Sequence, residues 1–273
     1  MSLAKQIKNQ IISNLSLNSD NQNVTLNNAL RLLSKWRSTL IQNTLLQHEG
    51  AKVIDGPLKG LDFIEKSAEG CHVAKILGCY EQPLQPYVRD AINEGYSTVL
   101  NIGCAEGYYA VGLARLMPET ISLAFDTNPH AQVACRALAA KNNVDDRVKV
   151  GGIFIPTDFE NYKGESVLIF CDIEGAEDEL LNIDLAPSLS FFDIIVESHE
   201  CLKTGLTQRL MSRFENTHEI TLVEDNGLRM LENLPNWFNK LSHLDQLLAT
   251  WEWRAGPTPW LVMRSKAMIR SNL

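Results

Sequence analysis

The sequence lacks any run of apolar residues long enough to cross a bilayer, and its opening residues, MSLAKQIKNQIISNL, alternate between polar and apolar side chains. A transmembrane helix needs about 20 consecutive apolar residues. A secretory signal needs a solid apolar core, which this opening does not have. We therefore expect a cytoplasmic protein without a membrane partner.

Basic residues are not in excess. The 33 acidic residues outnumber the 25 lysines and arginines, and the formal net charge is -8. Surfaces that follow extended nucleic acid need clustered lysine and arginine. We therefore expect no extended nucleic acid among the partners, although a local basic groove is compatible with this composition.

Paired cysteine motifs are also missing. No Cys-x-x-Cys occurs, and several of the six cysteines lie within apolar runs that read as strands or helices. The six are Cys71, Cys79, Cys104, Cys135, Cys171 and Cys201. We expect reduced thiols, with neither a zinc site nor a disulfide framework.

In the first 50 residues, apolar side chains recur every three or four positions, which is typical of amphipathic helices. We predict one helix over residues 3–15 and a second over residues 25–47, with Thr25 as N-cap. The polar residues 16–23 between them are predicted to be a mobile linker. Two roles stay open for these helices, which are a cover over an active site and a homodimer interface.

From about Ser97 onward, short apolar strands alternate with helices. Strands are predicted at 97–103, 121–126, 147–152, 166–172, 191–198, 219–225 and 259–265. Helices are predicted at 106–117, 128–143, 175–183 and 205–216. This alternation is typical of a parallel sheet covered on both faces. We predict an α/β domain over residues 76–273, preceded by a helical extension over residues 1–75.

Ligands of such sheets bind at the carboxyl ends of the strands. A small-residue turn with Gly103, Ala105 and Gly107 follows the first strand. It lacks the spacing of G-x-G-x-x-G and has no P-loop lysine, so neither a dinucleotide nor a phosphate is favoured. Asp126 follows about twenty residues later at the end of the next strand, where a carboxylate can accept the hydroxyl hydrogens of a ribose.

The segments VLNIGCAEGYYAVGLA and LAFDTNPHA resemble the first two motifs of class I S-adenosylmethionine-dependent methyltransferases. LIFCDIEGAEDELL, GCYEQPL and DIIVESHE are similar to segments of the FkbM type within that class. The resemblance covers roughly residues 78–200. It implies a Rossmann-like sheet, mostly parallel with an antiparallel last strand, helices on both faces, and S-adenosylmethionine as cofactor.

The resemblance also implies which residues bind the cofactor and which carry the reaction. The cofactor-binding residues are Tyr80, Glu81, Asn101, Gly103, Cys104, Ala105, Gly107, Asp126, Thr127 and Asp172. The resemblance implies transfer to an oxygen of a small-molecule, sugar or polyketide-like acceptor. At Asn101 this chain departs from the family, which usually has an acidic residue there to favour the ammonium group of the cofactor. Glu106 and Glu81 are the candidates to supply that charge.

His199, Glu197 and Glu174 are predicted to be catalytic because a hydroxyl acceptor has to lose its proton to a base. Glu177 and Glu179 read more simply as acidic residues at a helix N-terminus. A divalent cation on Asp172, Glu197 or His199 is compatible with the residue types but is not predicted.

Two alternatives remain. One is a protein that binds S-adenosylmethionine and interacts with a partner without turnover, and the other is a nicotinamide-dependent oxidoreductase, which the spacing of the turn disfavours. Trp251, Trp253 and Trp260 either line an acceptor pocket or pack internally.

Overall fold

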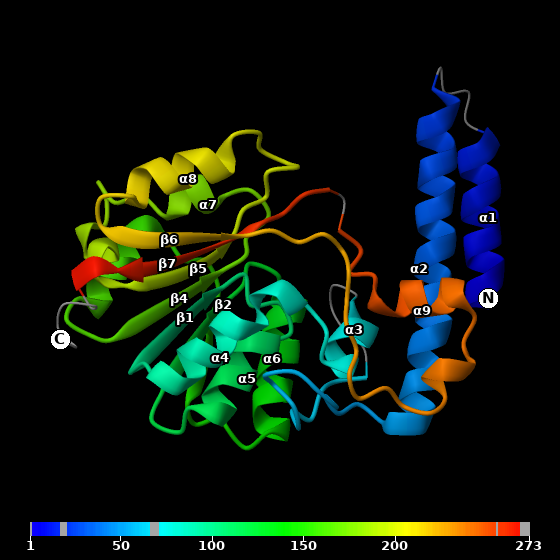
Figure 1. Cartoon of the computed structure of the whole chain (residues 1–273), viewed down its shortest axis with the longest axis horizontal. Coiled ribbons are helices and arrows are strands. Elements are labelled where there is room, and N and C mark those ends of the chain that lie inside the picture. Colours follow the sequence, from blue (N-terminus) through cyan, green and yellow to red (C-terminus); the bar gives the residue numbers. More distant parts are fainter. Residues whose placement is uncertain (1, 17–20, 66–70, 255, 268–273) are drawn as a thin grey trace.

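The computed structural model describes residues 2–16, 21–65, 71–254 and 256–267. Figure 1 shows an α/β body and a long helical hairpin beside it. The body is built on one seven-stranded sheet with the strand order β3-β2-β1-β4-β5-β7-β6. The strands are β1 Thr98–Ile102, β2 Ile121–Phe125, β3 Val148–Gly151, β4 Val167–Cys171, β5 Asp193–Glu197, β6 His218–Val223 and β7 Trp260–Ser265.

All the pairs among β1 to β5 are parallel, and β7 is antiparallel to both β5 and β6. The predicted fold is therefore confirmed, including the antiparallel last strand. The order of the strands reverses between β1 and β4, and this is the switch point at which open α/β sheets bind ligands.

Alternate residues of the strands face two separate apolar cores. Val99 and Leu168 pack with α4 (Gln85–Glu94) and α5 (Tyr108–Leu116), whereas Leu100 packs in the core of α8 (Leu206–Phe214). The short α7 lies on the same side as α8, and α6 lies with α4 and α5 (Figure 1). Their bounds are α6 Pro129–Lys141 and α7 Glu177–Leu180. Because successive side chains of a strand point to opposite faces, both faces of the sheet are apolar. Helices cover both faces, as predicted.

The predicted helices at the N-terminus are confirmed as α1 (Leu3–Ser16) and α2 (Gln22–Glu49). The predicted N-cap at Thr25 is wrong, because Asn21 caps α2 by accepting the N–H groups of Asn23 and Val24. The linker prediction covers residues 16–23. Residues 17–20 of it lie outside the described residues, and the rest is helical or caps a helix.

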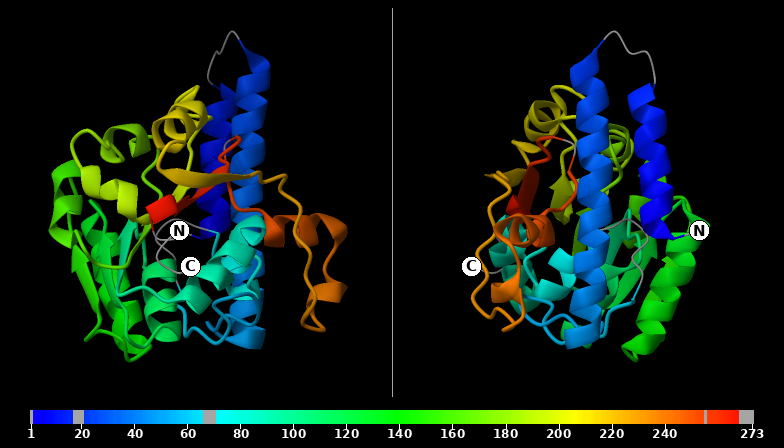
Figure 2. Two further views of the ribbon diagram at one scale, coloured as in Figure 1. Left: turned by 60° about the vertical axis from the view of Figure 1, so that its left-hand side comes forward. Right: turned by 90° about the vertical axis from the view of Figure 1, so that its right-hand side faces the viewer.

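The hairpin of α1 and α2 stands against a second helical segment, which the chain inserts between β6 and β7. Figure 2 shows α1 and α2 side by side, with the inserted segment next to α2. This segment carries α9 (His243–Thr250), and Arg37 of α2 donates to both oxygens of Asp245 at 2.6 Å. Helix α3 (His72–Leu77) contacts both α2 and α9. The predicted division at residues 75 and 76 falls within α3 and stays a prediction.

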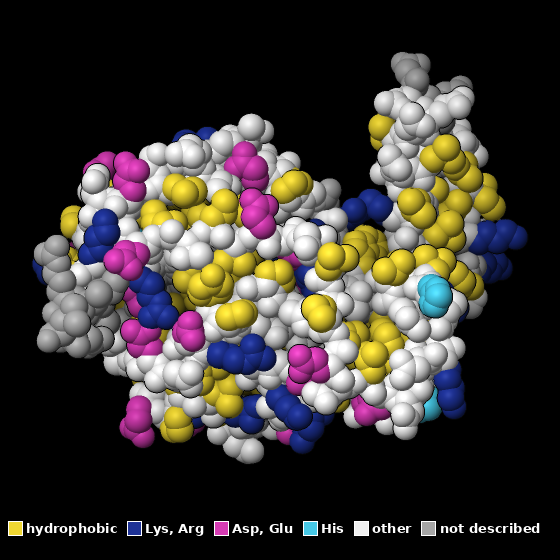
Figure 3. Space-filling view, in the orientation of Figure 1, with side chains coloured by type: hydrophobic (Ala, Val, Ile, Leu, Met, Phe, Trp, Pro, Cys, Tyr) yellow, Lys and Arg dark blue, Asp and Glu magenta, His cyan; other side chains and the backbone are white. Residues whose placement is uncertain are grey.

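Four 3-10 helices complete the described elements, which are Gln82–Leu84, Pro156–Tyr162, Pro187–Phe191 and Phe238–Lys240. Among the described residues, no helix combines the length and the apolar character that a membrane span requires. Apolar side chains nevertheless lie on the outer face of the hairpin (Figure 3), and Leu26, Leu30 and Leu33 of α2 are among the exposed ones.

Candidate active site

The turn between β1 and α5 bends through three left-handed residues, Gly103, Ala105 and Gly107, with φ of 80°, 47° and 92°. A Cβ on Gly103 would lie 1.6 Å from the carbonyl oxygen of Asp172. Glycine is therefore required there both for its conformation and for the close approach of the β4 end. The N–H of Ala105 donates to Asp126 Oδ2 at 2.9 Å.

Asp126 thus joins the turn to the end of β2. Its second oxygen accepts the N–H of Asn128 at 2.7 Å. Each carboxylate oxygen offers two lone pairs, so both oxygens retain acceptor capacity beyond these backbone bonds. Asp126 and Thr127 line a first cavity of about 610 Å³ at the carboxyl ends of the strands.

The first cavity has apolar walls that sequence reasoning missed. Ile153, Phe154 and Ile155, in the loop after β3, supply one of them. Ile153 is 75% exposed, and isoleucine is a residue type that is otherwise usually buried. In the sequence, this wall could have been found from the apolar residues of GGIFIP, which lie just beyond the end of a predicted strand. An apolar cavity with a carboxylate at its edge is the usual form of a small-molecule site.

Two further cavities adjoin the first. The second cavity, of about 250 Å³, includes Lys35, Lys75, Asp172, Glu197, His199 and Trp253 in its lining. The third cavity, of about 30 Å³, lies over the turn and includes Tyr80, Asn101, Gly103, Cys104 and Ala105. Asp172 is part of the lining of all three. The end of β4 is therefore the point at which the three cavities meet.

Asn101 is buried at the end of β1, with 3% of its surface exposed. Its Nδ2 donates to the carbonyl of Phe170 at 3.2 Å, while its Oδ1 has no hydrogen-bond partner among the described residues. A buried acceptor without a donor is costly, and a ligand that brings an N–H group into the third cavity would remove that cost.

The two carboxylates considered as substitutes for an acidic residue at position 101 are both engaged. Glu106 is fully buried and bonded to Lys75 Nζ at 2.5 Å. Glu81 accepts the hydroxyl of Tyr109 at 2.6 Å and pairs with Arg254 at 3.1 Å. Both of these carboxylates are therefore matched by cations, whereas Asp172 is an acidic residue in the lining of the third cavity that Asn101 shares.

His199, directly beyond β5, is buried, with Nδ1 2.7 Å from Glu177 Oε1. Its Nε2 faces Asp172 and Glu174, each at 3.5 Å. Burial alone would lower the pKa of His199, but the hydrogen bond with Glu177 and the surrounding carboxylates together raise it above 6.5. The structure brings five of the predicted site residues together at the second cavity, which are Tyr80, Asp172, Glu174, Glu197 and His199.

Glu177 is more than an acidic residue at a helix N-terminus, because it also bonds with His199. Its side chain is fully buried, and Oε1 also accepts the N–H of Gly175 at 3.1 Å. Burial acts to raise the pKa of Glu177, but the bonds from His199 and Gly175 hold it below 4.5. A carboxylate that remains ionised fixes the orientation of the imidazole. The predicted helix over 175–183 is shortened to the four residues of α7.

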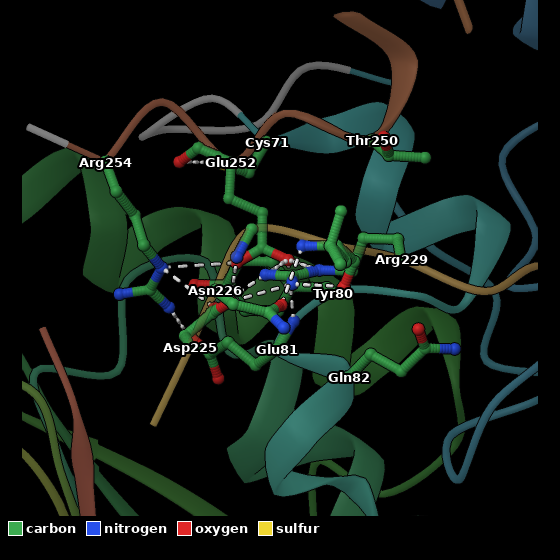
Figure 4. A network of polar contacts seen from close by, with 12 residues as sticks. Cys71, Tyr80, Glu81, Gln82, Asp225, Asn226, Arg229, Thr250, Glu252 and Arg254 are labelled. Carbon is green, nitrogen blue, oxygen red and sulfur yellow. Dashed lines mark hydrogen bonds and ion pairs between the residues drawn. The ribbon is translucent and has the colours of Figure 1, made fainter. Parts of the chain in front are cut away.

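Glu197 lies in the lining of the second cavity, and its carboxylate is bonded to Arg254. Arg254 also pairs with Glu252 at 3.3 Å, within the buried network shown in Figure 4. Arg229 donates to Glu252 at 2.6 Å from the other side. Burial raises the pKa of Glu252 to about 8, against the lowering effect of Arg229. The segment between β6 and β7 therefore supplies part of the site. Two of its tryptophans were candidates from the sequence, but Glu252 and Arg254 were not.

Gly107, another predicted cofactor-binding residue, packs against Cys135. A Cβ on Gly107 would lie 2.6 Å from the sulfur of Cys135, so the role of Gly107 is to allow the turn. Among the residues that the structure describes, two groups offer ligand atoms within 4.8 Å of one another. One is Asp172 with Glu174 and His199, and the other is Glu81 with Asp172 and Glu197.

No family model and no curated protein matches the sequence. Solved structures do match. An O-methyltransferase from Bacillus cereus in complex with SAH is 15% identical, covers 83% of this chain and 97% of its own, and has a TM-score of 0.46. An SAH-bound methyltransferase from Podospora anserina is 16% identical, covers 68% and 78%, and has a TM-score of 0.45.

Proposed function

We propose that this protein is an S-adenosylmethionine-dependent methyltransferase, of the FkbM type that its motifs resemble, and that it methylates an oxygen of a small-molecule or sugar-like acceptor. One observation carries the proposal. Asp172 lies at the meeting point of an apolar first cavity edged by Asp126 and a polar second cavity that contains His199. The first cavity suits a nucleoside cofactor and the second suits an acceptor, and because the two cavities adjoin, the reacting groups can be held close together.

The residues present fit the cofactor. The free lone pairs of Asp126 suit ribose hydroxyls, and the apolar wall of Ile153, Phe154 and Ile155 suits an adenine ring. The orphaned Oδ1 of Asn101 suits the ammonium group of the methionine part. When bound, S-adenosylmethionine supplies an electrophilic methyl group on a sulfonium.

The protein's own task is to align the acceptor and to take its proton. The Nε2 of His199 opens on the second cavity beside Asp172, while Nδ1 is held by Glu177. Neutral His199 accepts the hydroxyl proton at Nε2, and the carboxylate of Glu177 stabilises the imidazolium that results. Glu174 lies near the same nitrogen, but its side chain is largely exposed. Its carboxylate therefore contributes a negative charge that favours the protonated form of His199. Glu197 is tied to Arg254 and is the weaker candidate for a base.

Transfer of a labelled methyl group tests the proposal. The purified chain is incubated with S-adenosylmethionine carrying a deuterated methyl group and with a deproteinised small-molecule extract of cells. We expect labelled products by mass spectrometry, and we expect His199→Ala to reduce them at least about 100-fold while S-adenosylhomocysteine still binds. Binding without any labelled product would favour the interaction protein over the enzyme.

A further inference from the structure

Lys35 is a cation of the second cavity that comes from outside the α/β body. It lies on α2, and its Nζ stands 4.6 Å from the centre of the Trp253 ring. The other cations of this cavity are matched by carboxylates, Lys75 by Glu106 and Arg254 by Glu197. In the part of the chain that the structure describes, Lys35 forms no ion pair. It therefore offers a positive charge that the protein itself does not neutralise.

Trp253, which also lines the second cavity, carries a further donor. Its indole Nε1 is buried, and among residues with described positions no hydrogen-bond partner accepts from it. Its backbone has a φ of 63°, which is rare for a bulky side chain and is found where a site imposes it. Arg31 of α2 holds this conformation by donating to the carbonyl of Trp253 at 2.9 Å.

Apart from the ion-paired Lys75, Glu197, Glu252 and Arg254, the polar groups considered in the second cavity form two sets. Asp172 and Glu174 surround His199 at the strand ends, whereas Lys35 and the Trp253 N–H lie where α2 meets the segment between β6 and β7. An acceptor whose hydroxyl reaches His199 would place another group near Lys35 and Trp253. An oxyanion at that point would satisfy both donors, since charge-assisted hydrogen bonds are the stronger kind.

We propose that the acceptor carries an anionic group, a carboxylate or a phosphate, which Lys35 and the indole N–H of Trp253 bind while its hydroxyl lies at His199. This inference rests on the proposed methyltransferase function. It makes α2 a wall of the acceptor site, and it assigns Lys35 and Trp253 as residues that determine specificity.

The charge of the labelled product tests the proposal even while the acceptor is unidentified. The products of the labelled methyl assay are passed over an anion-exchange resin at pH 8. We expect the label to be retained, and release by alkaline phosphatase distinguishes a phosphate from a carboxylate. Label in the unretained fraction would overturn the anionic acceptor. Absence of any labelled product would instead count against the proposed function.

Variants of Lys35 connect the product to the residue. We expect Lys35→Met to raise the KM for the retained acceptor about 10- to 100-fold with little change in kcat. Lys35→Arg keeps the positive charge and should bring KM most of the way back to the wild-type value. Trp253→Phe, which keeps a ring and removes the N–H, should raise KM more modestly. Lys8→Met on α1 is the matched control and should change nothing. Equal losses of kcat and of S-adenosylhomocysteine affinity in Lys35→Met would show a merely structural role and overturn the assignment.

Discussion

In the proposed function, nucleoside recognition depends most on Asp126. We expect Asp126→Ala to weaken the binding of S-adenosylhomocysteine about 10- to 100-fold, because hydrogen bonds to a charged group contribute about 1.5–3 kcal/mol. Isothermal titration measures the change. Asp146→Ala, at an exposed aspartate beyond α6, is the control. Unchanged affinity in Asp126→Ala would refute the role in ribose binding.

The proposed pair of His199 and Glu177 predicts a specific pH dependence of turnover. If the neutral imidazole is the base as proposed, the rate should rise with pH through a midpoint above 6.5, the ordinary pKa of histidine. Glu177→Gln removes the carboxylate that stabilises the imidazolium, so the midpoint should move to lower pH. Initial rates between about pH 5.5 and 9.5 test this. A midpoint that stays in place in the variant would contradict the assigned pair.

The same pair contributes to stability over a limited pH range. The raised pKa of His199 stabilises the fold fully below 6.5, and this contribution is lost as pH rises through the folded-state pKa. The lowered pKa of Glu177 stabilises it above 4.5. We therefore expect the melting temperatures of the wild type and His199→Ala to differ most between pH 4.5 and 6.5. A difference that grows toward pH 9 would be inconsistent with the pair.

The turn between β1 and α5 depends on the absence of a side chain at Gly103. Gly103→Ala adds a clash with the β4 end to the cost of a left-handed alanine, so we expect a loss of about 2–5 kcal/mol in the free energy of unfolding. Gly227→Ala isolates the conformational cost, because its φ is 74° and no atom lies within 4 Å of an added Cβ. Urea titration compares them. Equal losses would argue against the close approach of Asp172.

The strands could be predicted from sequence because each is a short apolar run bounded by polar residues or glycine. The predicted strand at residues 97–103, for example, is β1 at Thr98–Ile102. Helix α9 could not be predicted in this way, because it is placed by partners distant in sequence, such as Arg37, which lies 208 residues from Asp245. For the same reason, the sequence could offer Trp253 as a pocket residue but could not predict its contact with Lys35, which joins two segments that carry no motif.

The motifs predicted the strand-end residues of the site, but not their pairing. Glu197 and His199 lie two residues apart, yet one is bound by Arg254 and the other by Glu177. Which carboxylate is neutralised depends on a side chain from the segment between β6 and β7. Periodicity cannot show that, since it reports only on the face of the element to which a residue belongs.

The hairpin and the body are joined by the bidentate pair of Arg37 and Asp245. We expect a double-mutant cycle of Arg37→Ala and Asp245→Ala to give a coupling of about 1 kcal/mol that weakens in high salt, because Arg37 is partly exposed. Loosening this junction should raise the KM for the acceptor and leave S-adenosylhomocysteine affinity unchanged. Loss of cofactor affinity as well would mean that the hairpin supports the whole body.

Isothermal titration of the whole chain with S-adenosylhomocysteine and, separately, with NAD tests the proposed cofactor most directly. A turn that suits a ribose but lacks the G-x-G-x-x-G spacing should bind the first compound and not the second. We predict saturable binding of S-adenosylhomocysteine and no measurable binding of NAD. Tight binding of NAD without a response to S-adenosylhomocysteine would contradict the methyltransferase.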